Sequence, residues 1–229
     1  FQRDILEEMG FGEVLRMERM RTDPALTQAL RSRWDTEAMA FILTWGHMIP
    51  SLENVSRITG LQVYGRPYLE QLVQGSRREL AREPEAQSDL DLRRFLILFL
   101  GRLLFATRGH AVHCHFLPLL DDLSAVVGFA WGAAFLAHQF DSLGASDRQT
   151  STSGFYPFLQ VWAYLHLPGL GRGVLERPGL VPIARRWDSP QDSRSLEDQL
   201  TRLQELIDGY SYLDVVWQPY LEEGDGGQP

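Results

Sequence analysis

The stretch from Phe95 to Phe140 constrains the fold more than any other part of the sequence, because no other segment is apolar enough to centre a core. Its apolar residues recur at intervals of three and four, which is the spacing of one face of a helix. Together with one residue just before the stretch, they are Leu92, Phe95, Leu96, Phe99, Leu100, Leu103 and Leu104, then Leu123, Val126, Val127, Ala130, Trp131, Ala134 and Phe135. We therefore predict two buried helices joined by a short histidine-rich segment.

The second of these runs, Leu123 to Phe140, raises the question of a membrane span. It carries no formal charge over about the length of a membrane-spanning helix. However, it is rich in alanine and glycine, contains His138 and Gln139, and directly follows two aspartates. We therefore expect a buried helix of a globular core, and no membrane partner.

Composition excludes several kinds of chemistry. The chain has 229 residues and is 44% hydrophobic, which is enough for a substantial core. Its formal net charge of -8 argues against a general grip on nucleic-acid phosphates, although a local basic patch stays open. All 22 basic residues other than histidine are arginine. The absence of lysine rules out a pyridoxal Schiff base and a phosphate-loop lysine.

Cysteine usage and the start of the chain bear on the compartment. The single cysteine, Cys114, has no partner for an intrachain disulfide, which favours the cytosol or the nucleus. The chain opens on Phe1 without a visible secretory signal, as an excised domain would. We therefore expect a protein that works in a reducing compartment.

Local signals along the chain predict a mainly helical fold with one small β-hairpin. Asp23 and Pro24 are typical of a helix start, and Ser51 to Gly60 has the cap residues of another helix. Between them, residues 40–50 alternate apolar and smaller side chains around Gly46, which predicts the hairpin. A third buried helix opens near residue 157, and an amphipathic helix follows residue 195.

The chain shows no clean break in composition, so we predict one compact domain over residues 1–221 and a flexible tail over residues 222–229. Residues 168–193 are rich in proline, glycine and arginine, which predicts a long irregular loop. Loops of that length are usually functional or disordered, so this loop is a candidate contact surface.

Four motifs follow one another along the chain. They are RSRWDTEAMAFILTWGHMIPSLENVSRITGLQVYGRP, the core stretch with its L-P-L-L and W-G, then FLQVWAYLHLPGL and VVWQPY. Together they resemble the plant mobile domain family over nearly the whole chain. The matching positions are Trp34, Gly46, His47, Asn54, Gly60, Leu61, Gly65, Pro67, His113, Pro118, Trp131, Gly132, Trp162, Trp217, Pro219 and Tyr220.

Two positions depart from the family pattern. His47 stands where the family usually has glutamate, and Asn54 stands where it has aspartate. If those acidic side chains had a chemical role, this chain lacks it. If their role was structural, Asn54 can still serve near a helix start.

The resemblance implies a nuclear protein acting in meristem maintenance and transposon silencing, together with a PP7-type Ser/Thr phosphatase. Similar domains occur inside plant transposable elements and fused to such phosphatases. The family is also labelled aminotransferase-like. That label does not fit a chain without lysine, and we expect no cofactor.

The remaining candidates for chemistry each have a structural alternative. The cluster His110, His113, Cys114 and His115 offers zinc-ligand side chains, but adjacent residues seldom point at one metal, so a buried, hydrogen-bonded histidine is the alternative we favour. The acidic pairs are Asp121–Asp122, explained by helix capping, and Glu222–Glu223, explained by a solvated tail. His138 is a candidate base or, as we prefer, a core histidine.

Arginines and one tryptophan form the candidate interaction residues. They are Arg77, Arg78 and Arg82 in one segment, and Arg185, Arg186 and Trp187 in the long loop. These residues suit acidic partners or nucleic acid, or else form an ordinary solvated arginine surface. Of the six tryptophans, we expect Trp187 to be the exposed one.

The sequence therefore predicts a non-enzymatic scaffold domain whose loops, above all residues 168–193, dock a phosphatase or a chromatin partner. The alternative is a transposon-derived nucleic-acid-binding module, which the net charge disfavours. A cryptic enzyme or metal protein comes third.

Overall fold

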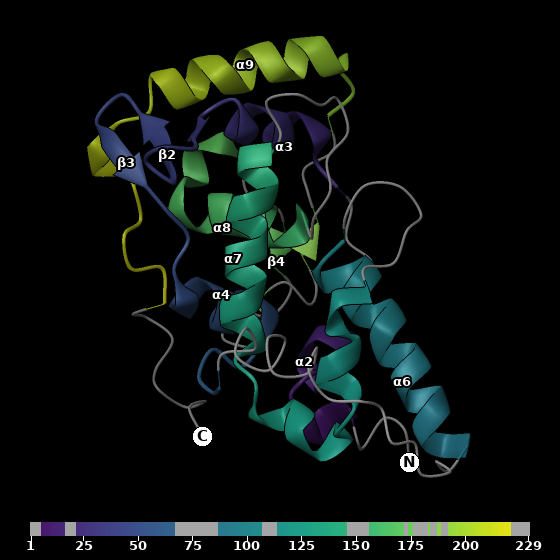
Figure 1. The fold of residues 1–229 in the computed structure, drawn as a ribbon. Helices are drawn as coiled ribbons and strands as arrows, with labels where there is room; N and C mark the ends of the chain where they lie inside the picture. The colour runs from purple at the N-terminus through teal and green to yellow at the C-terminus, as the bar shows by residue number, and fades with distance from the viewer. Residues whose placement is uncertain are drawn as a thin grey trace.

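The computed structural model describes residues 6–16, 22–66, 87–106, 114–145, 156–171, 174–175, 183, 187–188 and 192–220. They form one mainly helical domain, as predicted, with a three-stranded and a two-stranded antiparallel sheet. The α-helices are α2 Gly12–Leu15, α3 Pro24–Arg31, α4 Leu52–Thr59, α6 Gln87–Phe99, α7 Trp131–Gly144, α8 Tyr156–His166 and α9 Leu196–Asp208. Figure 1 shows α7 and α8 in the middle of the domain, α9 across one end and α6 along one side.

Short helices and strands complete the described part of the chain. The π-helix η1 spans Leu100–Leu104, and the 3-10 helices are η2 Cys114–Leu120, η3 Leu123–Gly128, η5 Pro168–Leu170 and η7 Tyr212–Asp214. The strands are β1 Trp34–Asp35, β2 Ala40–Leu43, β3 Gly46–Met48, β4 Val174–Leu175 and β5 Trp187–Asp188.

The predicted hairpin is confirmed, and a third strand extends it. Strand β2 pairs antiparallel with β3, in the register Phe41 to Met48, and its other edge pairs with β1, where Trp34 lies opposite Phe41. The Phe41 ring also stacks on Trp162 of α8, with the ring centroids 5.1 Å apart. The Phe41 side chain therefore helps to anchor the sheet to the helical core.

Helix caps form where the sequence predicts them. The Asp23 side chain accepts a hydrogen bond from the Leu26 amide, and Pro24 occupies the first turn of α3. Ser51 caps α4, which ends at Gly60 in the left-handed conformation with φ of 73°. Ser195 caps α9 through the Asp198 amide, at 3.1 Å. These caps need only neighbouring residues, which is why local signals sufficed.

The second half of the central stretch differs from the sequence prediction. The prediction of a single helix over Leu123–Phe140 is wrong, because η3 ends at Gly128 and α7 begins only at Trp131. The backbone of Phe129 is extended because Arg66 pairs with both sides of it: the Arg66 amide donates to the Gly128 carbonyl, and its carbonyl accepts from the Ala130 amide. A distant strand-like contact therefore breaks the helix.

The first half of the stretch is helical, as predicted. Helix α6 spans Gln87–Phe99, and the Asp91 carboxylate accepts hydrogen bonds from the Gln87 side chain and from Arg94. Its last turn continues as the π-helix η1. The apolar face is buried through Leu92, Leu96, Phe99, Leu100 and Leu104.

The long loop after α8 is more regular than predicted. Strands β4 and β5 pair antiparallel in the register Val174 to Asp188, which joins the two ends of that loop. Helix α9 then packs against α3, with Leu203 and Ile207 buried and Arg33 paired to Asp208. The predicted tail over residues 222–229 lies outside the described residues.

In the described part of the chain, no helix combines the length and hydropathy that crossing a lipid bilayer requires.

Candidate functional site

Residues from three distant motifs meet in one buried hydrogen-bond network at the start of α4. Asn54 lies in the first turn of α4, His166 ends α8, and Tyr220 closes the W-x-P-Y segment. Their side chains are 4%, 6% and 7% exposed. We call Asn54, His166 and Tyr220, together with the exposed N-cap residue Ser51, the buried polar network.

Asn54 is the hub of this network. The Ser51 amide donates to Asn54 Oδ1 at 2.7 Å, which fixes the orientation of the side-chain amide. Nδ2 therefore points the other way, 2.9 Å from His166 Nε2 and 2.9 Å from the Tyr220 hydroxyl. The backbone amide of Asn54 in turn donates to Ser51 Oγ at 3.2 Å, which completes a capping box. Asn54 thus keeps the structural role that the sequence left open for it.

The partners of His166 define its protonation. Nδ1 lies 2.8 Å from the Val216 carbonyl, which can only accept, so Nδ1 carries the hydrogen. Nε2 is then the acceptor for the side-chain amide of Asn54. Burial lowers the pKa of His166, and the hydrogen bond to Val216 offsets only part of this effect. His166 is therefore held neutral.

This environment predicts that stability depends on pH through His166. Because its folded-state pKa lies below the unfolded value, the unfolded chain binds the proton first. We expect the His166 contribution to be complete above about pH 6.5, the unfolded value, and lost as pH falls through the folded pKa. Urea unfolding between about pH 8 and about pH 5 measures it, with His166→Gln as the variant that cannot titrate there. An equal pH slope in both proteins would contradict the assignment.

Two glycines of the family motifs, Gly65 and Gly132, allow the segment after α4 to pack closely against η3 and α7. The segment after α4 lies against the start of α7, where the Gly132 amide donates to the Gln62 carbonyl at 2.8 Å. A Cβ atom on Gly132 would lie 2.8 Å from Val63 Cγ1, and one on Gly65 would lie 2.7 Å from the Gly128 carbonyl oxygen. These contacts make the two glycines part of the scaffold beneath the network.

An aromatic cluster lies on the surface beside the network. It consists of Trp45, in the turn between β2 and β3, with Tyr212 and Trp217 from the C-terminal segment. The three ring centroids lie 5.3–5.7 Å from one another. Tyr212 is 55% exposed and Trp217 is 46% exposed. We call these three residues the aromatic cluster.

Sequence patterns alone did not predict this cluster. Trp217 is exposed and Trp45 is half-buried, whereas most tryptophans other than Trp187 were expected in the core; the prediction for the Trp187 side chain stays untested. A usable signal was present: VVWQPY follows Ser211–Asp214, a short polar and aromatic segment outside any long helix. Only the fold shows that it meets the hairpin turn.

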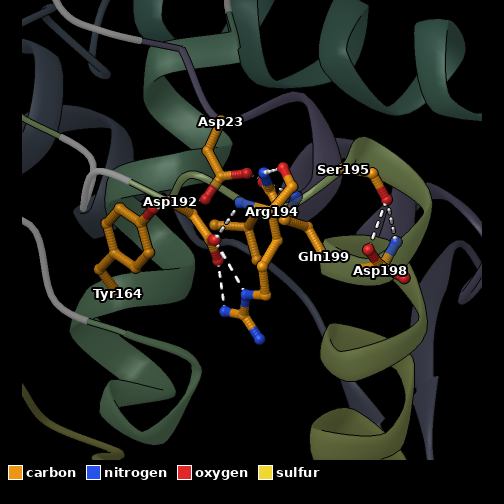
Figure 2. Close-up of polar contacts among 8 residues, drawn as sticks. Asp23, Tyr164, Asp192, Arg194, Ser195, Asp198 and Gln199 are labelled. Carbon is orange, nitrogen blue, oxygen red and sulfur yellow. Dashed lines mark hydrogen bonds and ion pairs between the residues drawn. The ribbon is translucent and has the colours of Figure 1, made fainter.

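A third group of polar residues lies at the starts of α3 and α9 (Figure 2). The Tyr164 hydroxyl donates to Asp23 Oδ2 at 3.0 Å, and burial, with the nearby carboxylate, raises the pKa of Tyr164. Just before α9, Arg194 forms an ion pair and a backbone hydrogen bond with Asp192, which lowers the pKa of that carboxyl to about 2. These contacts help to fix the starts of the two helices.

Other predicted residues have structural surroundings. His47 is exposed on β3, opposite Ile42, and Pro118 lies inside η2. Asp122 caps η3, and its hydrogen bonds to Ser124 lower its pKa, as the capping explanation predicts. His138 is half-buried, with Nε2 3.3 Å from the Ala106 carbonyl, an arrangement that agrees with the hydrogen-bonded alternative.

Several predicted residues lie outside the described part of the chain, so their predictions stay untested. They are Pro67, Arg77, Arg78, Arg82, His110, His113, Arg185, Arg186, Glu222 and Glu223, while Cys114, His115 and Trp187 are described in their backbone only. Within the described residues, no three histidine, cysteine or acidic side chains gather in a way that would hold a metal ion.

Comparison with known proteins adds family evidence. The family model described as "Plant mobile domain" matches residues 10–88 and 75–226. The Arabidopsis thaliana protein MAIN-LIKE 2 is 29% identical over 99% of this chain and 39% of its own length. The Arabidopsis protein MAINTENANCE OF MERISTEMS is 28% identical over 96% of this chain and 52% of its own length.

A relative with an enzyme name is also similar. The Arabidopsis serine/threonine-protein phosphatase 7 long form homolog is 28% identical over 95% of this chain, which covers 20% of that protein. The chain thus spans about half or less of the curated relatives it matches. No solved structure matches it.

Proposed function

Because this chain belongs to the plant mobile domain family, we propose that it is a non-enzymatic interaction domain of a nuclear protein that acts in transposon silencing and gene-expression control. Its partner in this proposal is a PP7-type Ser/Thr phosphatase. The observation that carries the proposal is the aromatic cluster, which is exposed on a surface held in place by the buried polar network.

The relatives support a link to phosphatases. A domain similar to this chain occurs within a protein named as a phosphatase 7 homolog, and similar domains occur in the MAIN-type proteins. Domains that are fused in one protein often act together in others. In this proposal the present chain acts as the MAIN-type domains do, and the phosphatase that it binds is a separate protein.

The geometry of the network supports a role without catalysis. The side chains of Asn54 and His166 form hydrogen bonds with each other, with Ser51, with Tyr220 and with the backbone. Both side chains are more than nine-tenths buried, so neither meets a substrate. The absence of lysine removes transamination in addition.

Trp217 gives the sharpest test of the proposed contact surface. We expect the domain to co-elute with a PP7-type phosphatase domain on size exclusion, and Trp217→Ala to weaken the complex by about tenfold or more, as the loss of an interface tryptophan does. Calorimetry on the purified pair measures the affinity. Leu196→Ala is the matched control, since Leu196 is 50% exposed at the start of α9, in a different element.

The same experiment decides between the contact surfaces and the functions. Trp187→Ala, run in parallel, tests the contact predicted from the long loop. If the phosphatase elutes alone while mixed-sequence DNA binds with a steep salt dependence, the nucleic-acid alternative replaces the scaffold. If the complex forms and Trp217→Ala leaves its affinity unchanged, the aromatic cluster is not the contact.

A further inference from the structure

Two residues of the aromatic cluster, Tyr212 and Trp217, are exposed, whereas Trp45 is half-buried. Trp45 stands at 75° to Trp217 and at 76° to Tyr212, while the latter two rings are tilted by 47°. The rings therefore form a stepped apolar surface, and Leu213 beside them is 87% exposed. Because the rings contact one another, a ligand packs on top of them and does not insert between them as a cation does in an aromatic cage.

The neighbouring charges are acidic. Asp208 ends α9 just before the segment of Tyr212, and Asp214 follows Leu213; both are exposed. Arg33 pairs with Asp208 from the side of α3. The chain as a whole has a net charge of -8. A positively charged partner segment therefore complements this surface.

Exposed tryptophan and tyrosine faces favour proline. A pyrrolidine ring offers a flat apolar surface, and a polyproline II segment is already extended, so little conformational entropy is lost when it docks on aromatic side chains. Its carbonyl groups are not used internally, so the Tyr212 hydroxyl can donate to one of them. An amphipathic helix would instead need a long apolar groove.

We propose that the aromatic cluster of Trp45, Tyr212 and Trp217 binds a basic, proline-rich segment of a partner protein in the polyproline II conformation. The inference rests on the proposed function, since it names the kind of segment that the scaffold recognises. The prolines pack on the rings, and the basic side chains pair with the exposed Asp214.

The test uses three synthetic peptides of equal length and this protein. One is an arginine-flanked proline-rich peptide, the second has every proline replaced by alanine, and the third has every arginine replaced by glutamate. Fluorescence anisotropy of labelled peptides measures binding. We expect the first peptide to bind at least about tenfold more tightly than either of the others, and Trp217→Ala to lose about the same factor. Leu196→Ala is expected to bind as the wild type does, and unfolding curves confirm that both variants fold.

Each contrary result has a distinct meaning. Equal binding of the alanine peptide would mean that charge alone is recognised, which overturns the proposal. Binding that survives Trp217→Ala would place the site elsewhere. Self-association that is lost on Trp217→Ala would make a second copy of this chain the occupant. If the phosphatase co-elutes but no peptide binds, this inference fails and the proposed function stands. If the proline-rich peptide binds but the phosphatase does not co-elute, the proposed phosphatase partner is wrong and this inference stands.

Discussion

Replacing Asn54 with leucine is expected to lower the free energy of unfolding by about 3–7 kcal/mol, because one side chain satisfies groups from three segments. The change leaves His166 Nε2 and the Tyr220 hydroxyl without the donor that now lies 2.9 Å from each. Each such loss costs about 1–3 kcal/mol, and the Ser51 amide also loses its acceptor in the capping box, which adds about 1 kcal/mol. Urea unfolding followed by circular dichroism measures the difference.

Ser51→Ala is the matched control for the cap. It removes the hydroxyl that accepts from the backbone amide of Asn54, but it leaves the side-chain contacts of Asn54 with His166 and Tyr220 in place. We expect this variant to lose only about 1 kcal/mol. If both variants lose the same amount, the network adds nothing beyond the cap, and the hub role of Asn54 is wrong.

Asn54→Asp tests the same hub through charge. The new carboxylate would face His166 Nε2 with an acceptor where the Asn54 amide now donates, so the imidazole is expected to take a proton and its pKa to rise. The contribution to stability then reverses its sign: it is present at low pH and lost as pH rises through the raised pKa. Asn54 is the only asparagine in the chain, so selective isotope labelling of asparagine reports on its side-chain amide in the wild type.

Gly132→Ala is the second large effect, and we expect a loss of about 2–3 kcal/mol from overpacking. The new Cβ atom would lie 2.8 Å from Val63 Cγ1, 3.0 Å from the Gln62 carbonyl oxygen and 3.2 Å from Val55 Cγ1. The Gln62 carbonyl belongs to the backbone and Val55 is fully buried in α4, so relieving these contacts requires α7 to move away from α4 and from the segment that follows it. That movement also stretches the hydrogen bond from the Gly132 amide to Gln62.

Gly144→Ala, at the end of the same helix, is the control for helix propensity. The nearest atom to its Cβ would be the Thr36 methyl group, at 3.3 Å, which a side-chain rotation can move. Alanine is also favoured over glycine inside a helix by roughly 0.5–1 kcal/mol, so we expect a change near zero. Differential scanning calorimetry of both variants measures the contrast; a Tm for Gly132→Ala equal to the wild-type value would contradict the close approach of α4 and α7.

Local sequence signals identified those elements whose ends depend on nearby residues. The caps at Asp23, Ser51 and Ser195 and the hairpin turn at Gly46 formed as predicted. Each needs only side chains and backbone groups a few positions apart. The helix predicted to start near Leu123 failed for the opposite reason: it is interrupted at a residue paired with Arg66, which is remote in the sequence.

The candidate site was visible only in pieces. The family motifs singled out Asn54, Trp217 and Tyr220, but nothing in their spacing indicated that Asn54 and Tyr220 share a hydrogen bond. His166 was missed altogether, although a lone histidine at the end of an apolar helix is a sign of a buried polar contact. The long loop drew attention through its composition, whereas the exposed rings lie at the hairpin turn and the C-terminal segment.

By itself, the sequence determined the family, the helical class, the caps and the absence of lysine chemistry, because each of these follows from residue identity and short spacing. Tertiary structure alone decided which motifs become neighbours, that Trp217 is exposed, and which ring nitrogen of His166 carries the hydrogen. The physical reason is that burial and hydrogen-bond partners depend on packing between distant segments, and the free energy of a buried polar group depends on those partners.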